Sequence, residues 1–195
     1  MRLFITVFLS CVALVVISAQ EEVPLDKLKL ELRDSMVLAM QSQDRKILNK
    51  QLPNFSLTTI ERDTISAAEL EGKPSVKILW DLYCQPCLDQ MEILNAITIK
   101  YKDKLNYISI TKHARHEVLR FLSQDKLNFT HLVNAKEYLD HELYFSTIPK
   151  ILILDKSNIV EQVIGVQQLR ECCSDGLSEK EEEYFVKLID SVLTI

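Results

Sequence analysis

Hydrophobic and polar residues along the chain follow two periods, and each period predicts a different kind of element. Between Leu25 and Leu48, apolar side chains recur every three or four residues in a polar segment without glycine, which predicts an amphipathic helix. Pro53 follows this helix, and residues 55–65 then alternate with a period of two. The alternation predicts a β-hairpin that turns at residues 61–63.

After Gly72 and Pro74, short β-prone segments alternate with segments of helical period. Strands are expected at residues 76–80, 105–110, 129–133, 150–154 and 159–166, and helices at 88–100, 115–124, 136–145 and 178–193. Strands that alternate with helices, and then two consecutive strands and a last helix, predict an α/β fold. We expect a central mixed β-sheet flanked by helices, with an N-terminal β-hairpin and a preceding helix.

The first residues have the pattern of a secretory signal peptide. Arg2 precedes an apolar run over residues 3–17, and the small Ala19 precedes acidic residues. We therefore expect a signal peptide at 1–19, a helical extension at 20–50 and the main domain at 51–195. The mature chain would have no stable membrane span and would be exported to the periplasm or cell envelope, with secretion as the alternative. A retained membrane anchor is the other interpretation of the same run.

Composition excludes two classes of function. Three glycines in 195 residues supply neither a glycine-rich phosphate loop nor a dinucleotide turn, so nucleotide-dependent chemistry is disfavoured. The net charge is -5, and the basic residues form no run that could follow a nucleic-acid backbone. We expect no nucleic-acid partner and no diffusible cofactor.

The cysteines carry the candidate chemistry. Cys84 and Cys87 form a CxxC motif between an expected strand and an expected helix. At such a turn, the unpaired N–H groups of the helix stabilise a thiolate, which is the species that attacks a disulfide. Cys84 is thus the candidate nucleophile, and Cys87, one turn further on, is the candidate resolving cysteine.

Other interpretations of the CxxC remain open. The pair could be a permanent disulfide, or half of a metal site completed by Cys172 and Cys173 or by a histidine. We expect no metal, because the second cysteine pair lacks CxxC spacing and His113 and His116 are distant from it in sequence. A binding or metal-handling module without oxidoreductase turnover remains the alternative function.

The order of these parts resembles the thioredoxin-like family, in particular exported thiol-disulfide oxidoreductases of the TlpA/ResA type. The resemblance covers about residues 51–195. It rests on Pro53-Asn54-Phe55-Ser56-Leu57, Leu70-Glu71-Gly72-Lys73-Pro74, the segment from Trp80 to Cys87, and Thr147-Ile148-Pro149 before a β-prone run. It implies a thioredoxin-like fold, protein thiol or disulfide substrates, and an upstream redox partner.

The resemblance also implies a substrate-binding surface. Pro149 would follow a cis peptide bond and face the CxxC, the backbone of Ile148 would pair with the substrate chain, and Tyr83 would line the same surface. Three positions depart from the family pattern: Ile78 stands where thioredoxins carry a buried aspartate, Tyr83 where the family commonly has tryptophan, and Glu92 where a helix proline is frequent. Asp81 stands where the related peroxiredoxins need a threonine, which disfavours peroxidase activity.

Three further features lie outside the CxxC motif. Cys172 and Cys173 follow the last expected strand in a polar loop and could be an auxiliary redox pair, a local clip or two free thiols. His131 and His141 are expected at the surface or at strand edges. The N-terminal helix could dock to a partner or cover one end of the core.

Overall fold

The structure, a computed structural model, describes residues 24–145, 147–172 and 178–194. The chain divides into two compact units, residues 1–39 and 40–195. The expected signal peptide at 1–19 lies outside the described residues. Helix α2 (Leu25–Ile47) begins within 1–39 and ends within 40–195, close to its expected bounds. In the described part of the chain, no helix is both long and apolar enough to span a membrane.

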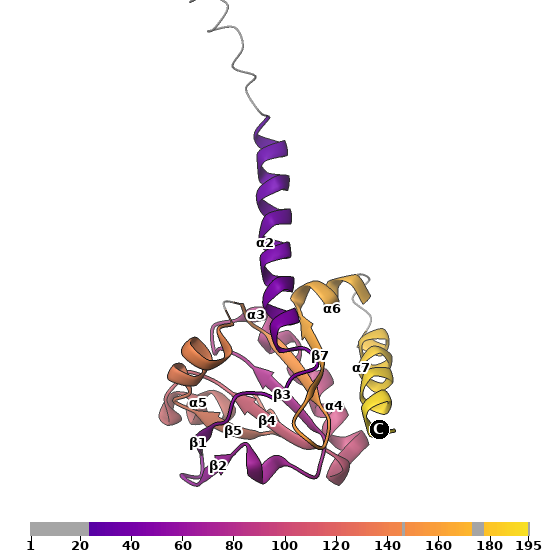
Figure 1. The fold of residues 1–195 in the computed structure, drawn as a ribbon. Helices are drawn as coiled ribbons and strands as arrows, with labels where there is room; N and C mark the ends of the chain where they lie inside the picture. Colours follow the sequence, from indigo (N-terminus) through magenta and orange to yellow (C-terminus); the bar gives the residue numbers. More distant parts are fainter. Residues whose placement is uncertain (1–23, 146, 173–177, 195) are drawn as a thin grey trace, which may run out of the picture. The chain divides into compact units, whose positions relative to one another are not determined.

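Residues 40–195 are built on one seven-stranded mixed sheet (Figure 1). Its strands are β1 (Ser56–Thr59), β2 (Thr64–Ser66), β3 (Ser75–Leu79), β4 (Asn106–Ile110), β5 (Thr130–Val133), β6 (Lys150–Leu154) and β7 (Val160–Gly165). They lie in the order β2-β1-β5-β4-β3-β6-β7. The β3–β4 and β4–β5 pairs are parallel and the other pairs are antiparallel, which confirms the mixed sheet and the N-terminal hairpin.

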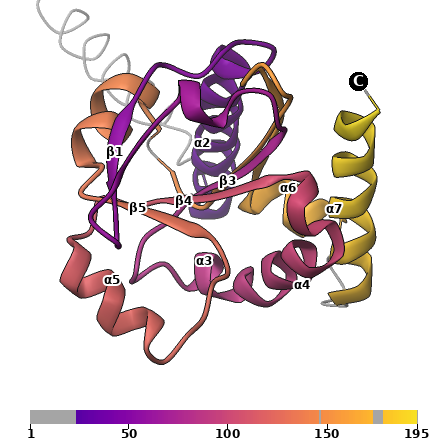
Figure 2. The same ribbon diagram turned by 90° about the horizontal axis from the view of Figure 1, so that it is seen from below.

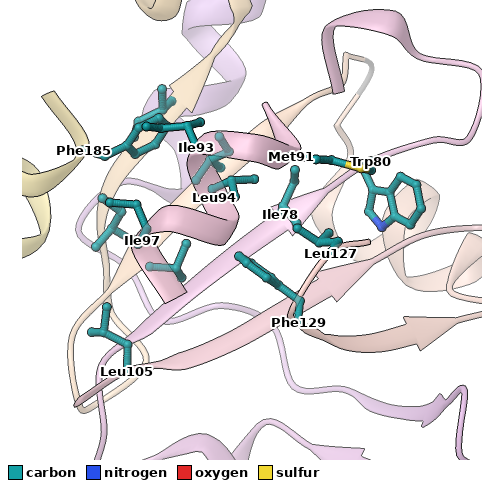
Figure 3. Packing of buried hydrophobic residues seen from close by; sticks show 14 of the residues in the cluster. Ile78, Trp80, Met91, Ile93, Leu94, Ile97, Leu105, Leu127, Phe129 and Phe185 are labelled. Carbon is teal, nitrogen blue, oxygen red and sulfur yellow. The ribbon is translucent and has the colours of Figure 1, made fainter. Parts of the chain in front are cut away.

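The sheet separates two hydrophobic clusters. Because side chains alternate between the faces of a strand, Ile151 and Ile153 of β6 belong to one cluster, and Leu152 and Leu154 belong to the other. On the first face, helices α4 (Met91–Tyr101) and α7 (Ser178–Leu193) pack side by side (Figure 2). Figure 3 shows side chains of α4 and α7 gathered over Ile78 of β3. The buried face of each helix therefore holds β3 in place, and β3 leads directly into the CxxC.

The helices differ from expectation in three places. The expected helix at 88–100 is two helices, α3 (Gln85–Asp89) and α4, which meet at Gln90. Helix α3 starts inside the CxxC because Pro86 lies in the first turn, where the missing N–H of proline costs nothing. The expected helix at 136–145 contains a π-helical turn, Tyr138–Leu143, whose ends are both buried.

The third difference is a helix that the sequence pattern missed. Helix α6 (Val166–Cys172) directly follows β7. Cys172 therefore lies at the end of a helix, whereas a loop was expected there from the sequence. Its only apolar residue shown to be buried is Leu169, too little to produce a recognisable period. The side-chain oxygen of Gln168 accepts the N–H of Gly165 at 3.0 Å and so fixes the corner between strand and helix. The remaining helix, α5 (Arg115–Leu122), matches its expectation.

Candidate active site

Cys84 and Cys87 lie at the carboxyl end of β3, a strand that is buried along its whole length. Cys84 directly precedes α3, and its carbonyl accepts the N–H of Cys87 at 2.9 Å and that of Leu88 at 3.2 Å. The two cysteines form a disulfide, with Cα atoms 5.2 Å apart. Cys87 is fully buried, whereas Cys84 is half-buried. An approaching disulfide would therefore reach Cys84 first.

The peptide bond between Ile148 and Pro149 is cis, as the family resemblance implies. Lys150 pairs with Leu79 in the antiparallel β3–β6 register, so Pro149 lies at the same end of the sheet as the turn that carries the cysteines. Ile148 is half-buried and packs against the same hydrophobic cluster as Cys84. The cysteine motif and the cis-proline, 65 positions apart from Cys84 to Pro149, thus meet at one edge of the fold.

A cluster of charged and polar side chains lies beside the cysteine turn. The Asp81 carboxylate is 2.8 Å from Lys112 Nζ and 3.0 Å from His113 Nε2, and it accepts the N–H of Tyr83 at 2.9 Å. Lys112 and His113 follow β4, which is the parallel neighbour of β3. The ring of Tyr83 meets the imidazole of His113 edge-on, with centroids 5.6 Å apart. The turn before Cys84 is thereby tied to the adjacent strand end.

This cluster keeps Asp81 ionised. Burial raises the pKa of Asp81, but the hydrogen bonds from Lys112 and from the Tyr83 N–H, together with the nearby imidazole of His113, outweigh it and lower the pKa to about 2. The same contact raises the pKa of Lys112. At neutral pH the carboxylate is therefore a fixed hydrogen-bond acceptor for the turn and does not donate a proton.

A pocket of about 300 Å³ adjoins both motifs. Its polar side is formed by Asp81, Lys112 and Asp140, and its other lining residues are Leu79, Trp80, Leu139, Phe145 and Ile148. The pocket therefore connects the turn before Cys84 with the residue before the cis-proline. A side chain from a polypeptide paired with Ile148 could enter it.

Several expected residues lie elsewhere. His131 is buried in β5, between β1 and β4, where Ser109 Oγ is 2.6 Å from its Nδ1; the expectation of a surface or edge position was wrong. His141 is exposed. Cys173 lies outside the described residues, so the idea of an auxiliary redox pair stays a prediction. Within the described residues, no group of three or more His, Cys, Asp or Glu side chains could hold a metal ion.

The sequence matches the AhpC/TSA family over residues 48–163, a range that contains both the CxxC and the cis-proline. The chain belongs to the AhpC/TSA family. Among curated relatives, the thiol-disulfide oxidoreductase ResA of Bacillus thuringiensis (strain Al Hakam) is 27% identical over 128 residues, which cover 64% of this chain and 74% of ResA. The thioredoxin-like protein YneN of Bacillus subtilis (strain 168) is 24% identical over 127 residues, 63% of this chain and 74% of YneN.

Solved structures show the same fold. A thioredoxin-like protein from Porphyromonas gingivalis superposes with a TM-score of 0.56 at 19% identity, covering 75% of this chain and 94% of that protein. A secreted Mycobacterium tuberculosis disulfide oxidoreductase, homologous to Escherichia coli DsbE, gives a TM-score of 0.51 at 21% identity over 57% of this chain and 82% of that protein. The expected thioredoxin-like fold is confirmed.

His113 and Lys112 are the parts of the site that sequence reasoning missed. His113 entered only as a remote candidate metal ligand, and Asp81 only as a departure from related families. One signal was available: both segments directly follow expected parallel strands, and the carboxyl ends of neighbouring parallel strands meet at one edge of a sheet. That signal would have placed Asp81 beside residues 111–113.

Proposed function

We propose that this AhpC/TSA-family protein is an exported thiol-disulfide oxidoreductase that acts on protein disulfides through Cys84 and Cys87. One observation carries the proposal. A half-buried cysteine is joined by a disulfide to a fully buried one at the start of a helix, at the sheet end that also holds the cis-proline. This arrangement presents one sulfur to a partner and keeps the other in reserve one helical turn away.

The proposed exchange proceeds in two steps from the reduced form. The thiolate of Cys84 attacks one sulfur of a substrate disulfide, whose S–S bond breaks, and the departing substrate thiolate takes a proton from solvent. The thiolate of Cys87 then attacks Sγ of Cys84, which restores the Cys84–Cys87 disulfide and releases the second substrate thiol. Two electrons pass to the substrate, and an upstream dithiol protein returns two electrons to this chain. The same steps in reverse oxidise a substrate dithiol.

Substrate alignment is assigned to three residues. A polypeptide would pair with the backbone of Ile148 beside Pro149, which is buried and so fixes the position of that backbone. Tyr83, which is 84% exposed, would form the adjoining wall. These contacts would bring a substrate disulfide to the sulfur of Cys84. Docking through the N-terminal helix stays a separate prediction.

The test is the trapping of mixed disulfides with single cysteine variants. The reduced wild type should reduce insulin, Cys84→Ser should be inactive, and Cys87→Ser should accumulate a mixed disulfide through Cys84, identified by non-reducing electrophoresis and mass spectrometry. Each variant loses the same intramolecular disulfide, so each controls for the stability change of the other. A folded but inactive wild type would overturn the proposed function, and trapping through Cys87 would reverse the two roles.

Export is tested separately by the N-terminus of the protein isolated from its native cells. Cleavage after Ala19 and recovery outside the cytoplasm are expected from the apolar run and the small residue that follows it. An intact N-terminus in the membrane fraction would instead indicate a retained anchor. An intact N-terminus in the cytoplasm would refute export.

A further inference from the structure

Tyr83 is an aromatic residue that is exposed directly before the nucleophilic cysteine. The residue is 84% exposed, yet its ring has a defined neighbour, the imidazole of His113, at 5.6 Å between centroids and an interplanar angle of 79°. An edge-to-face pair of this kind favours one orientation of the ring. The most exposed large apolar side chain at the site therefore has a preferred position.

His113 is buried beside two acidic side chains. Its side chain is 9% exposed; Nε2 lies 3.0 Å from Asp81 and Nδ1 lies 3.7 Å from Glu117 of α5. Its backbone carbonyl accepts the N–H of Asn134 at 2.9 Å. Burial therefore leaves the imidazole little room to move, and its edge meets the tyrosine ring.

Asp81 connects the imidazole to the backbone of the same tyrosine. Its Oδ1 accepts the N–H of Tyr83 at 2.9 Å and also faces His113 Nε2, while Oδ2 binds Lys112 at 2.8 Å. Both the main chain and the ring of Tyr83 are therefore anchored to one buried pair, Asp81 and His113. A flexible exposed ring would lose entropy on binding a partner, whereas an anchored ring has already lost it.

We propose that Asp81 and His113 are positioning residues that hold the Tyr83 ring as a fixed wall of the polypeptide-binding surface beside Cys84. They strengthen the binding of protein disulfides and leave the exchange itself to the two cysteines. This inference rests on the proposed function and deepens it. A small disulfide, which reaches Cys84 without covering the surface around it, gains much less from the fixed ring.

The test compares insulin with oxidised glutathione as substrates of the reduced full chain. His113→Ala should raise KM for insulin by about threefold to tenfold, the size expected for a lost aromatic pair, with kcat changed much less. The effect on glutathione disulfide should stay below about twofold on the same grounds. His116→Ala, at an exposed position on α5, is the matched control and should match the wild type with both substrates.

Two features separate an effect on the Tyr83 ring from a general loss of stability. In His113→Ala, Asp81 retains Lys112 and the Tyr83 N–H as partners, so no buried charge is left alone. Tyr83→Ala removes a ring from an exposed position without opening the core, and it should raise KM for insulin as well. If His113 acts through the ring, His113→Ala in the Tyr83→Ala background should add less than about twofold, because coupled residues are not additive.

Three results would overturn this inference but leave the proposed function intact. They are equal losses on insulin and glutathione disulfide, full additivity of the Tyr83 and His113 substitutions, and a change in the reduction potential of the cysteine pair with KM for insulin unaltered. The last result would indicate an electrostatic effect of the cluster on the sulfurs. A wild type inactive on both substrates would instead overturn the proposed function, and this inference with it.

Discussion

Removal of the Asp44 carboxylate is expected to destabilise the fold strongly. Asp44 lies near the end of α2, and its Oδ1 accepts a hydrogen bond of 2.5 Å from Nζ of Lys150, the residue that follows the cis-proline. The side chains of Lys150 and Asp44 are only 4% and 12% exposed. In Asp44→Ala, the ammonium of Lys150 would remain buried beside Phe145 without its counter-charge.

The magnitude follows from the cost of a buried unpaired charge. Removal of one partner from a buried ion pair costs about 3–5 kcal/mol, and the residual exposure of Asp44 favours the lower end, about 3 kcal/mol. For a domain of this size, the melting temperature should fall by about 6–12 °C. Urea denaturation followed by circular dichroism measures the free energy of unfolding.

Two variants separate the buried charge from other effects. Asp44→Ala combined with Lys150→Met should recover most of the loss, because an apolar chain of similar length replaces the unpaired ammonium. Glu182→Ala breaks a surface pair whose side chains are 42–46% exposed, and it should cost less than about 1 kcal/mol. A loss below 1 kcal/mol in Asp44→Ala, or no recovery in the double variant, would refute the reasoning.

Three further substitutions test buried groups. Burial lowers the pKa of Lys77 from 10.5 to about 8, so between these two pH values the unfolded chain binds more protons than the folded chain. Relative to Lys77→Met, the free energy of unfolding of the wild type should therefore rise by about 3 kcal/mol as the pH rises from 8 to 10.5. Parallel profiles of stability against pH for the two proteins would contradict this. Asp81→Asn should lose about 1–2 kcal/mol at pH 7, a deficit that should shrink as the pH falls from 4 to 2, because the pKa of Asp81 is lowered in the folded state; a deficit independent of pH would count against it. In Gly165→Ala, the new Cβ would lie 3.2 Å from Nζ of Lys150, which its ion pair holds in place, so a loss of about 1–2 kcal/mol is expected, and an unchanged urea midpoint would show that the lysine can shift.

Local pattern was sufficient to predict the sheet. Residues 76–80 and 150–154 are short apolar runs bounded by proline, glycine or polar turns, and both became central strands buried on both faces. Helix boundaries were harder to predict, because apolar spacing marks the buried face and not the first turn. For this reason the division of the expected helix at 88–100 into α3 and α4 was missed, as was α6, which buries too few apolar side chains to show a period.

The contacts of the site depend on register, which no local pattern contains. His131 was expected at the surface or at a strand edge, but β5 is an interior strand, and a hydrogen-bonding distance of 2.6 Å to Ser109 of the neighbouring strand satisfies its ring. The cysteine motif and the cis-proline were predicted through a family resemblance, and the first was also predicted from its chemistry. Neither motif indicates that His113, 26 positions after Cys87, packs against the ring of Tyr83.

The ends of three neighbouring strands build the site, and β3 lies between the other two, β4 and β6. Leu79 pairs with Ile110 of β4 on one side and with Lys150 of β6 on the other. The residues just beyond those pairs are therefore forced together: the turn that carries Asp81 and Cys84, the segment with His113, and the cis-proline. In the proposed function these segments have different tasks, because the turn supplies the sulfurs while its two neighbours shape the surface that a substrate meets.

Since β3 is buried along its length and packed on both faces, its register cannot slip by one residue without exchanging Ile78 and Leu79 between the two clusters. The stability of the core thus fixes the geometry of recognition, so a substitution such as Asp44→Ala, which acts beside the cis-proline, should weaken binding of protein disulfides before it impairs exchange at Cys84.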